Sequence, residues 1–269
     1  MHDSARFRRS QREGHGPRHV HAYWLGLRPY RLVHSLQQSL LEARSHNQVG
    51  DTLLLVEHTP VITMGRHASS HHLRLSPVAL EQRGIELVAT NRGGDVTFHG
   101  PGQLVAYPIL DLHPDWCSVT RYVQLLADTM ICLAHEHGVG AGTIDRYPGV
   151  WVDTRTPSSW PGQHKLHSPA KLGAIGVRLS RWITMHGLAM NLHTDLTYFQ
   201  SIVPCGISEY PVTSLHELTG SHLSPAAAAP RAALILCRLF DASLAPFHDL
   251  SRELNLRVDL FQTPAHPVP

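Results

Sequence analysis

The sequence predicts an α+β domain in which helices flank a mixed β-sheet. Short apolar strands and amphipathic helices follow one another without the regular strand–helix alternation of a parallel α/β fold. One long segment of alternating apolar residues indicates a β-hairpin, which is typical of antiparallel pairing. The chain has 269 residues, of which 42% are hydrophobic, so it can bury a sizeable core.

The first half of the chain is expected to form one helix followed by short strands. Pro29 favours a helix start, and apolar residues then recur with helical spacing at Tyr30, Val33, Leu36, Leu40 and Leu41. Short apolar runs bounded by turn residues predict strands at Asp51–His58, Pro60–Gly65, Ile85–Asn91, Val96–His99 and Leu104–Leu110.

The second half is expected to contain three helices and the hairpin. Ser118 is a predicted N-cap, and Gly138 ends a helix whose apolar positions are Tyr122, Leu125, Leu126, Thr129 and Leu133. A strand at Gly149–Val152 and a loop at 157–170 precede a long hairpin over Lys171–Leu192, which turns near 180–182. Ser214 with Glu217 predicts a short capped helix, and Ser224-Pro225 opens a last one.

Composition sets the domain boundaries and excludes several classes of function. We expect a basic, disordered tail at 1–20, a single folded domain at 21–245 and a C-terminal extension at 246–269. A net charge of +2 is too small to indicate nucleic-acid binding, and no apolar run could cross a membrane. The 22 histidines lack metal-ligand spacing, so no metal site is expected. Four cysteines without CxxC spacing suit a cytoplasmic location.

Lysine is rare in this chain. Only Lys165 and Lys171 are lysines among the 23 basic residues. A lysine pKa moves readily on burial, whereas an arginine stays protonated, so a retained lysine suggests a role that a guanidinium cannot fill. Chance retention explains each lysine equally well when it is considered alone.

Two cysteines are candidate nucleophiles. Pro204 and Gly206 place Cys205 in a turn, whereas Cys117 lies beside a helix start, where a thiolate is favoured. His99 and His186 are candidate proton partners for the thiol. The remaining cysteines, Cys132 and Cys237, fall within apolar helical patterns and are expected to pack in the core.

The stretch RGGDVTFHGPGQLVAYPIL, from Arg92 to Leu110, contains glycines at positions 93, 94, 100 and 102. Glycine lets the backbone approach another group closely or adopt a positive φ. The approached group is either another strand or a ligand, and the residues alone favour strand crossing. In the ligand interpretation, Val96 and Phe98 form one wall of the slot.

Four motifs in order, RGGDVTFHGPGQLVAYPIL, KLGAIG, HGLAMNL and IVPCGI, resemble the lipoyl(octanoyl) transferase family from about Ala22 to Phe240. The resemblance implies a biotin/lipoyl-ligase-like catalytic fold. It also implies Cys205 as the acyl-thioester nucleophile and Lys171 as the residue that lowers the cysteine pKa. The substrate would be lined by Arg92, Gly93, Gly94, Asp95, Val96, Thr97, Phe98, His99, Ala174, Ile175, Gly176, Gly187, Leu188 and Ala189.

The same resemblance implies the partners. An acyl carrier protein would donate the octanoyl group, and lipoyl domains of 2-oxoacid dehydrogenase complexes and the glycine cleavage H protein would accept it. No cofactor is implied, and the enzyme is expected to be a monomer. Two alternatives remain: an ATP-dependent lipoate or biotin protein ligase, and a non-catalytic scaffold that binds carrier proteins. The basic tail and the proline-rich loop at 157–170 depart from the family pattern.

Overall fold

The computed structural model of this chain describes residues 18–203 and 209–262. The large sheet contains β1 (Arg18–Arg28), β2 (Asp51–His58), β6 (Gln103–Ile109), β7 (Ala141–Ile144), β8 (Tyr147–Asp153), β9 (Pro169–Ser180), β10 (Ile183–Asn191), β11 (Ala242–Leu244) and β12 (His248–Asp249). The small sheet contains β3 (Val61–Met64), β4 (Glu86–Ala89) and β5 (Val96–His99). The helices are α1 (Tyr30–Ser45), α2 (Pro77–Gln82), α3 (Val119–Glu136), α4 (Leu215–Thr219) and α5 (Pro225–Leu239).

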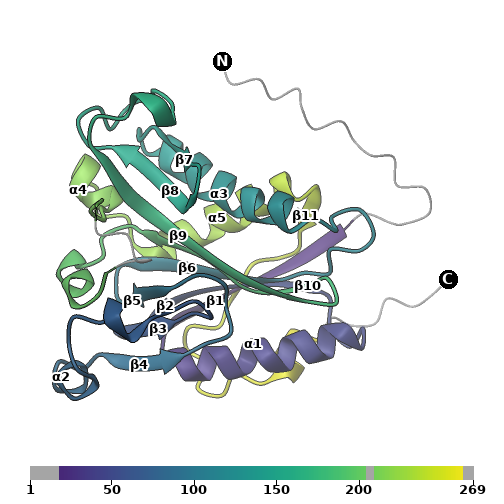
Figure 1. The fold of residues 1–269 in the computed structure, drawn as a ribbon. Coiled ribbons are helices and arrows are strands. Elements are labelled where there is room, and N and C mark those ends of the chain that lie inside the picture. The colour runs from purple at the N-terminus through teal and green to yellow at the C-terminus, as the bar shows by residue number, and fades with distance from the viewer. Residues whose placement is uncertain (1–17, 204–208, 263–269) are drawn as a thin grey trace.

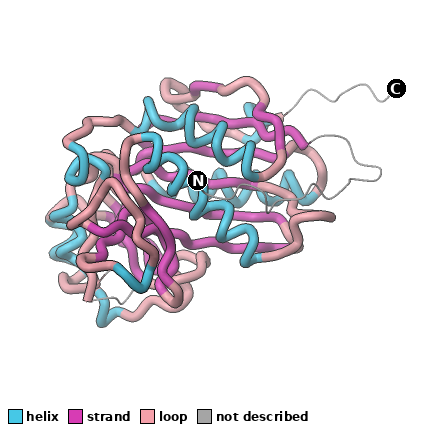
Figure 2. Tube along the Cα trace, turned by 90° about the horizontal axis from the view of Figure 1, so that it is seen from above, coloured by secondary structure: helices cyan, strands magenta, loops and turns pink. Residues whose placement is uncertain are grey.

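The molecule is layered around the large sheet. Its strand order is β11–β1–β2–β6–β10–β9–β8–β7, with β12 also paired to β1. Helices α3 and α5 pack together on one face, and α1 packs on the opposite face (Figure 1). Figure 2 shows helices lying over the row of strands. Because β1 and β2 are parallel while β2, β6, β10 and β9 are antiparallel, the predicted mixed-sheet α+β fold is confirmed.

The helices form where the apolar spacing predicts them. In α1 the buried face includes Tyr30, Val33, Leu36 and Leu40, which pack on the sheet, while Leu41 is only half buried. Helix α3 begins at its predicted cap, where the Ser118 hydroxyl accepts the Arg121 N–H at 3.3 Å. Both helices owe their positions to one apolar face, since an isolated helix of this length is marginal in water.

Strands β9 and β10 form the predicted hairpin. Ser180 pairs with Ile183, and the two turn residues Arg181 and Trp182 have φ of 50° and 66°. Two consecutive positive φ values define a type I′ turn, whose twist matches that of the strands. The hairpin sets the register that brings Gly176 opposite Gly187 and Ala174 opposite Ala189.

The two ends of the described chain meet on β1. This strand begins at Arg18, inside the segment assigned to the tail, and pairs in parallel with both β11 and β12. Leu256 and Phe261, from the segment assigned to a C-terminal extension, are buried in the core on the α1 side. The folded unit therefore reaches beyond both boundaries expected for the catalytic domain.

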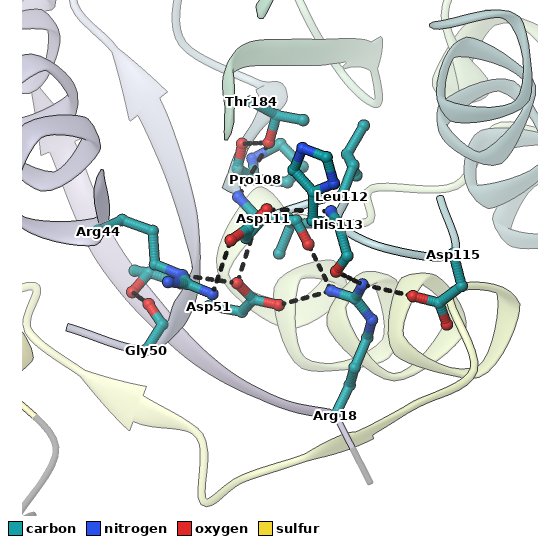
Figure 3. Close-up of polar contacts among 12 residues, drawn as sticks. Arg18, Arg44, Gly50, Asp51, Pro108, Asp111, Leu112, His113, Asp115 and Thr184 are labelled. Carbon is teal, nitrogen blue, oxygen red and sulfur yellow. Dashed lines mark hydrogen bonds and ion pairs between the residues drawn. The ribbon is translucent and has the colours of Figure 1, made fainter. Parts of the chain in front are cut away.

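A polar cluster ties the start of β1 to the approach of α3 (Figure 3). The Arg18 guanidinium lies 3.3 Å from an Asp51 carboxylate oxygen and 2.8 Å from one of Asp115, and it also donates to the carbonyls of Asp111 and His113. The side chains of Arg18 and Asp51 are 10% and 7% exposed. Removing one partner of such a buried pair leaves an uncompensated charge, so Arg18 is a strong anchor.

The part of the chain that the structure describes contains no helix long and apolar enough to cross a membrane.

Candidate active site

A narrow cavity lies between the large sheet and the small sheet. Its floor is made of small residues that share one face of the hairpin, namely Ala174, Gly176, Gly187 and Ala189. Val105 and Tyr107 of the adjacent strand β6 extend this floor, and the opposite walls come from α1 and from β5 with the turn before it. The cavity is lined by Tyr30, Arg92, Gly94, Asp95, Thr97, His99, Val105, Tyr107, Ala174, Ile175, Gly176, His186, Gly187, Leu188 and Ala189.

A smaller chamber beside Lys171 adjoins the cavity. The two chambers share Thr97, Ala174 and Ala189 as a common wall, and the second is also lined by Lys171 itself. The Lys171 side chain is buried with its ammonium 5.5 Å from the centre of the Trp151 ring. Lys171 and the small residues of the hairpin thus lie in two adjoining chambers.

Gly149 makes room for this lysine, and sequence reasoning missed it. Its φ is +129°, and a Cβ there would lie 2.6 Å from Lys171 Cε and 2.4 Å from the carbonyl oxygen of Gly173. A residue with any side chain would push the lysine aside. Position 149 was assigned only to a strand, because no pattern in the sequence shows that β8 faces Lys171 at this point.

Cys205 lies outside the described residues, but the chain on both sides of it is fixed near the site. The Lys171 N–H donates to the Pro211 carbonyl at 2.9 Å, and the Thr213 N–H donates to the Lys171 carbonyl at 2.9 Å. On the other side, the Val203 N–H donates to the His72 carbonyl at 2.8 Å. These contacts hold the described residues that precede and follow the cysteine segment, and they bring Pro211 and Thr213 to Lys171.

Asp95 connects the glycine turn to the same region. One of its carboxylate oxygens lies 2.5 Å from His72 Nδ1, and the backbone carbonyl of His72 accepts the Val203 N–H. Arg92 anchors the turn from the other side, since its guanidinium donates to the Thr63 hydroxyl at 2.8 and 3.1 Å and to the Thr63 carbonyl at 2.6 Å. The turn is therefore held by β3 and by the chain that leads to Cys205.

The glycines of the Arg92–Leu110 stretch are required for different structural reasons. Gly94 has φ of +83° and lines the cavity, whereas the Gly93 N–H bonds the Val177 carbonyl at 2.8 Å. A Cβ on Gly100 would lie 2.4 Å from the Phe98 ring, and one on Gly102 would lie 2.7 Å from the His193 backbone. The ligand interpretation therefore fits Gly94, which alone of these four lines the cavity, whereas Gly93, which the resemblance also placed against the substrate, Gly100 and Gly102 pack against the protein itself.

The wall supplied by β5 is also corrected. Val96 and Phe98 point into a separate apolar cluster with Ile62 and Ile202, and the cavity is lined by Thr97 and His99 instead. Both faces of β5 are buried. The alternation along the strand correctly placed Val96 and Phe98 on one face of β5 and Thr97 and His99 on the other. The apolar character of Val96 and Phe98 did not show which of the two faces lines the cavity.

Two buried histidines line the cavity as neutral groups. Burial lowers the pKa of His99 to about 3, and the nearby His58 lowers it further. Burial likewise lowers the pKa of His186 to about 3, with His34 as the next cause. Both were candidates to activate the thiol, but such imidazoles are weak proton acceptors near neutral pH. Their positions suit packing against a bound group rather than proton transfer.

A chain of polar side chains, not predicted from the sequence, joins His99 to the Lys171 chamber. His99 Nδ1 donates to Gln103 Oε1 at 2.7 Å, and Gln103 Nε2 donates to Asn191 Oδ1 at 2.9 Å. Asn191 Nδ2 then donates to the Thr213 carbonyl at 2.9 Å. Because Thr213 itself bonds Lys171, this chain fixes the two chambers relative to each other.

The three cysteines in the described part of the chain all have a raised thiol pKa, although Cys117 Sγ lies 3.3 Å from His113 Nδ1. Loss of solvent and the carboxylates of Asp111 and Asp115 raise the pKa of the Cys117 thiol. Burial raises the pKa of Cys237 to about 12, and it also raises the pKa of Cys132. The helix-start argument for Cys117 is outweighed because the nearby acidic side chains oppose a thiolate.

The fold and this cavity define a catalytic domain of the lipoyl-ligase class. Residues 29–234 match the family described as the lipoyl protein ligase A/B catalytic domain. A lipoate-protein ligase A bound with ATP shares the fold at a TM-score of 0.62 and 16% identity, over 87% of this chain and 94% of that one. The bipartite lipoate protein ligase of Thermoplasma acidophilum also shares the fold, at a TM-score of 0.64 and 14% identity, over 89% of this chain and 92% of that one.

Sequence relatives are more specific. The octanoyltransferase of Solibacter usitatus is 43% identical over 82% of this chain and 93% of its own, and that of Chloroflexus aggregans is 41% identical over 85% and 97%. The octanoyltransferase of Myxococcus xanthus is 41% identical over 83% of this chain, which spans 60% of its length. This chain belongs to the lipoyl(octanoyl) transferase family, and it is an acyltransferase.

Proposed function

We propose that the protein transfers an octanoyl group from octanoyl-acyl carrier protein to one lysine of a lipoyl domain, through a thioester on Cys205. The observation that carries the proposal is the pair of adjoining chambers, one floored by glycine and alanine and the other lined by the buried Lys171. Burying an eight-carbon chain there contributes several kcal/mol, at about 0.8 kcal/mol per methylene.

In the first step the Cys205 thiolate attacks the carbonyl carbon of the carrier thioester. A C–S bond forms to Cys205, the C–S bond to the carrier breaks, and the carrier sulfur leaves and takes up the proton that Cys205 gave. In the second step the acceptor lysine amine attacks the enzyme thioester. A C–N bond forms, the bond to Cys205 breaks with return of its thiolate, and the amine proton is released. The thioester is already activated, so ATP is not needed.

Lys171 supplies the positive charge that favours the Cys205 thiolate. A free cysteine thiol has a pKa of about 8.5, and a neighbouring cation lowers it. The space left by Gly149 suits the slim lysine stem, and a wider guanidinium would not fit between Gly149 and Trp151. Arginine also stays protonated and cannot exchange a proton during the reaction.

The proposal extends to partners and location. Acyl carrier proteins and lipoyl domains are generally acidic, so exposed arginines such as Arg74, which lines the hollow next to the Lys171 chamber, are suited to transient docking. We place the enzyme in the cytoplasm as a monomer, and the acceptors are lipoyl domains of 2-oxoacid dehydrogenase complexes and the glycine cleavage H protein.

Intact-mass analysis tests the reaction. The protein is mixed with octanoyl-acyl carrier protein without ATP, and one octanoyl group should add to Cys205. Cys205→Ala should lose the adduct, and Cys117→Ala, a matched control, should keep it. Peptide mapping that places the adduct on Cys117, or a strict need for ATP, contradicts the proposal.

The pH profile of Cys205 alkylation tests the role of Lys171. In Lys171→Ala the thiol pKa should rise toward about 8.5, its free value. Lys171→Arg should fail in transfer nearly as badly as Lys171→Ala, because the site requires a compact amine. An unchanged alkylation profile in Lys171→Ala would remove Lys171 from the mechanism.

A further inference from the structure

The deep end of the cavity, away from Lys171, carries two polar atoms that lack a partner. Tyr30 and His186 both line the cavity and are each 1% exposed. The Tyr30 hydroxyl and His186 Nδ1 have no hydrogen-bond partner within residues 18–203 and 209–262. Buried polar groups are normally paired, so two orphans at one end of a ligand cavity indicate that they face the bound molecule.

The state of each atom follows from its neighbours. Asn91 Oδ1 accepts from His186 Nε2 at 2.9 Å, so the neutral ring leaves Nδ1 as an acceptor. The Tyr30 hydroxyl keeps its proton, because burial raises its pKa to about 12. The deep end thus offers one donor and one acceptor, and neither carries a charge.

His186 is held in place at a conformational cost. Its φ is +60°, which is unusual for a residue other than glycine inside a strand. The Gln37 side chain accepts the His186 N–H at 3.0 Å, and the imidazole stacks on His34 with ring centres 5.6 Å apart. A strained backbone that several contacts maintain is typical of functional positions.

The register of the hairpin gives the length of the site. Gly173 belongs to the Lys171 chamber, and Gly176 pairs with Gly187, which directly follows His186. Three residues of strand advance about 10 Å. An extended peptide advances about 3.5 Å for every three backbone bonds. At the same advance per bond, the seven carbon–carbon bonds of an octanoyl group span about 8 Å. An octanoyl tail that begins beside Gly173 and follows the strand therefore ends near the level of Gly187, and a longer tail reaches the polar atoms.

We propose that the Tyr30 hydroxyl and His186 Nδ1 form a polar stop that selects acyl chains of about eight carbons. This inference rests on the proposed function, since it assumes that the acyl chain enters past Lys171. In a wholly apolar cavity each added methylene improves binding about fourfold, so decanoyl would be preferred about fifteenfold. Covering each orphan with methylenes instead lowers binding by about fivefold to a hundredfold.

The test compares three donors loaded on acyl carrier protein: octanoyl, decanoyl and 8-hydroxyoctanoyl. With the unmodified protein, decanoyl should be used about tenfold less efficiently than octanoyl. The 8-hydroxyoctanoyl group should be used within about threefold of octanoyl, because its hydroxyl can accept from Tyr30 and donate to His186. An apolar end would reject that hydroxyl by about tenfold or more.

Tyr30→Phe should raise the decanoyl-to-octanoyl ratio about tenfold and lower use of the hydroxylated chain. Tyr122→Phe is the matched control and should leave both ratios unchanged. Tyr122 is a tyrosine on the buried face of α3 and does not line the cavity. Calorimetric binding of free octanoate and decanoate gives the same ratio without transfer. If the decanoyl-to-octanoyl ratio is the same in Tyr30→Phe as in the unmodified protein, the polar stop is overturned. If no adduct forms on Cys205, the proposed function is contradicted, and the polar stop is then judged from the calorimetric ratio of decanoate to octanoate binding.

Discussion

Mild acid should destabilise this protein strongly, because three buried histidines are neutral in the folded state. Burial lowers the pKa of His58 to about 4 and those of His99 and His186 to about 3. An unfolded histidine has a pKa of about 6.5, so below that pH the unfolded chain binds more protons. Stability is therefore full above about pH 7 and falls as the pH drops from about 6.5 toward 4.

The size of the effect follows from the same values. Between pH 7.5 and 5.5 each of these histidines lowers the free energy of unfolding by about 1.4 kcal/mol. Over this range the imidazole of the unfolded chain becomes largely protonated, which stabilises the unfolded state by about 1.4 kcal/mol, while the buried imidazole of the folded state stays neutral. The three together give roughly 4 kcal/mol, a large share of a typical domain stability of about 5–15 kcal/mol. Urea unfolding at the two pH values measures it.

Variants separate this effect from general acid sensitivity. His186→Asn removes one of the three imidazoles, and asparagine tolerates the positive φ at this position. Its pH-dependent loss should be smaller than that of the unmodified protein by about 1.4 kcal/mol. His135→Asn removes an exposed imidazole on α3 and should change nothing. A total loss below about 1 kcal/mol, unaffected by His186→Asn, would refute the reasoning.

Three further substitutions test the geometry. Gly149→Ala should lower the free energy of unfolding in urea by about 3 kcal/mol, because of backbone strain and overpacking. It should also displace Lys171 and so shift the pH profile of Cys205 alkylation. An unchanged profile would contradict the contact between position 149 and the Lys171 side chain. Gly94→Val should block octanoyl transfer, whereas Gly84→Val, which also has a positive φ but open space around it, should cost similar stability and keep transfer. Arg18→Ala should lower the unfolding free energy by about 3 kcal/mol, and a loss under about 1 kcal/mol would show that its carboxylate partners are solvated.

The sequence was informative where a pattern has a local cause. The Ser118 cap, the apolar face of α1 and the hairpin turn at Arg181 each depend on neighbouring residues, and the structure contains all three. The family resemblance had named Ala174, Gly176, Gly187 and Ala189 as lining the substrate, and the hairpin register places these four residues together on the cavity floor.

The sequence was less informative where tertiary packing decides. Tyr30 lies in an apolar helical pattern and was assigned to the core, because nothing local shows that α1 crosses the cavity end of β6 and β10. Val96 and Phe98 were expected to line the slot because they are apolar, yet a second cluster covers that face. Strand β1 was missed altogether; it pairs with β2 along one edge and with β11 and β12, from the other end of the chain, along the other edge.

That pairing of the chain ends has a consequence for biosynthesis. Ser243 bonds His19 across 224 residues, so the outer edge of β1 is left unpaired until nearly the whole domain has left the ribosome. Closing a loop of that length costs entropy that local contacts do not offset, which slows the final step of folding. Until then the nascent chain exposes a β-edge, which is the kind of surface that pairs with other chains. Strands β11 and β12, which are synthesised long after β1, therefore shield the outer edge of β1 from aggregation.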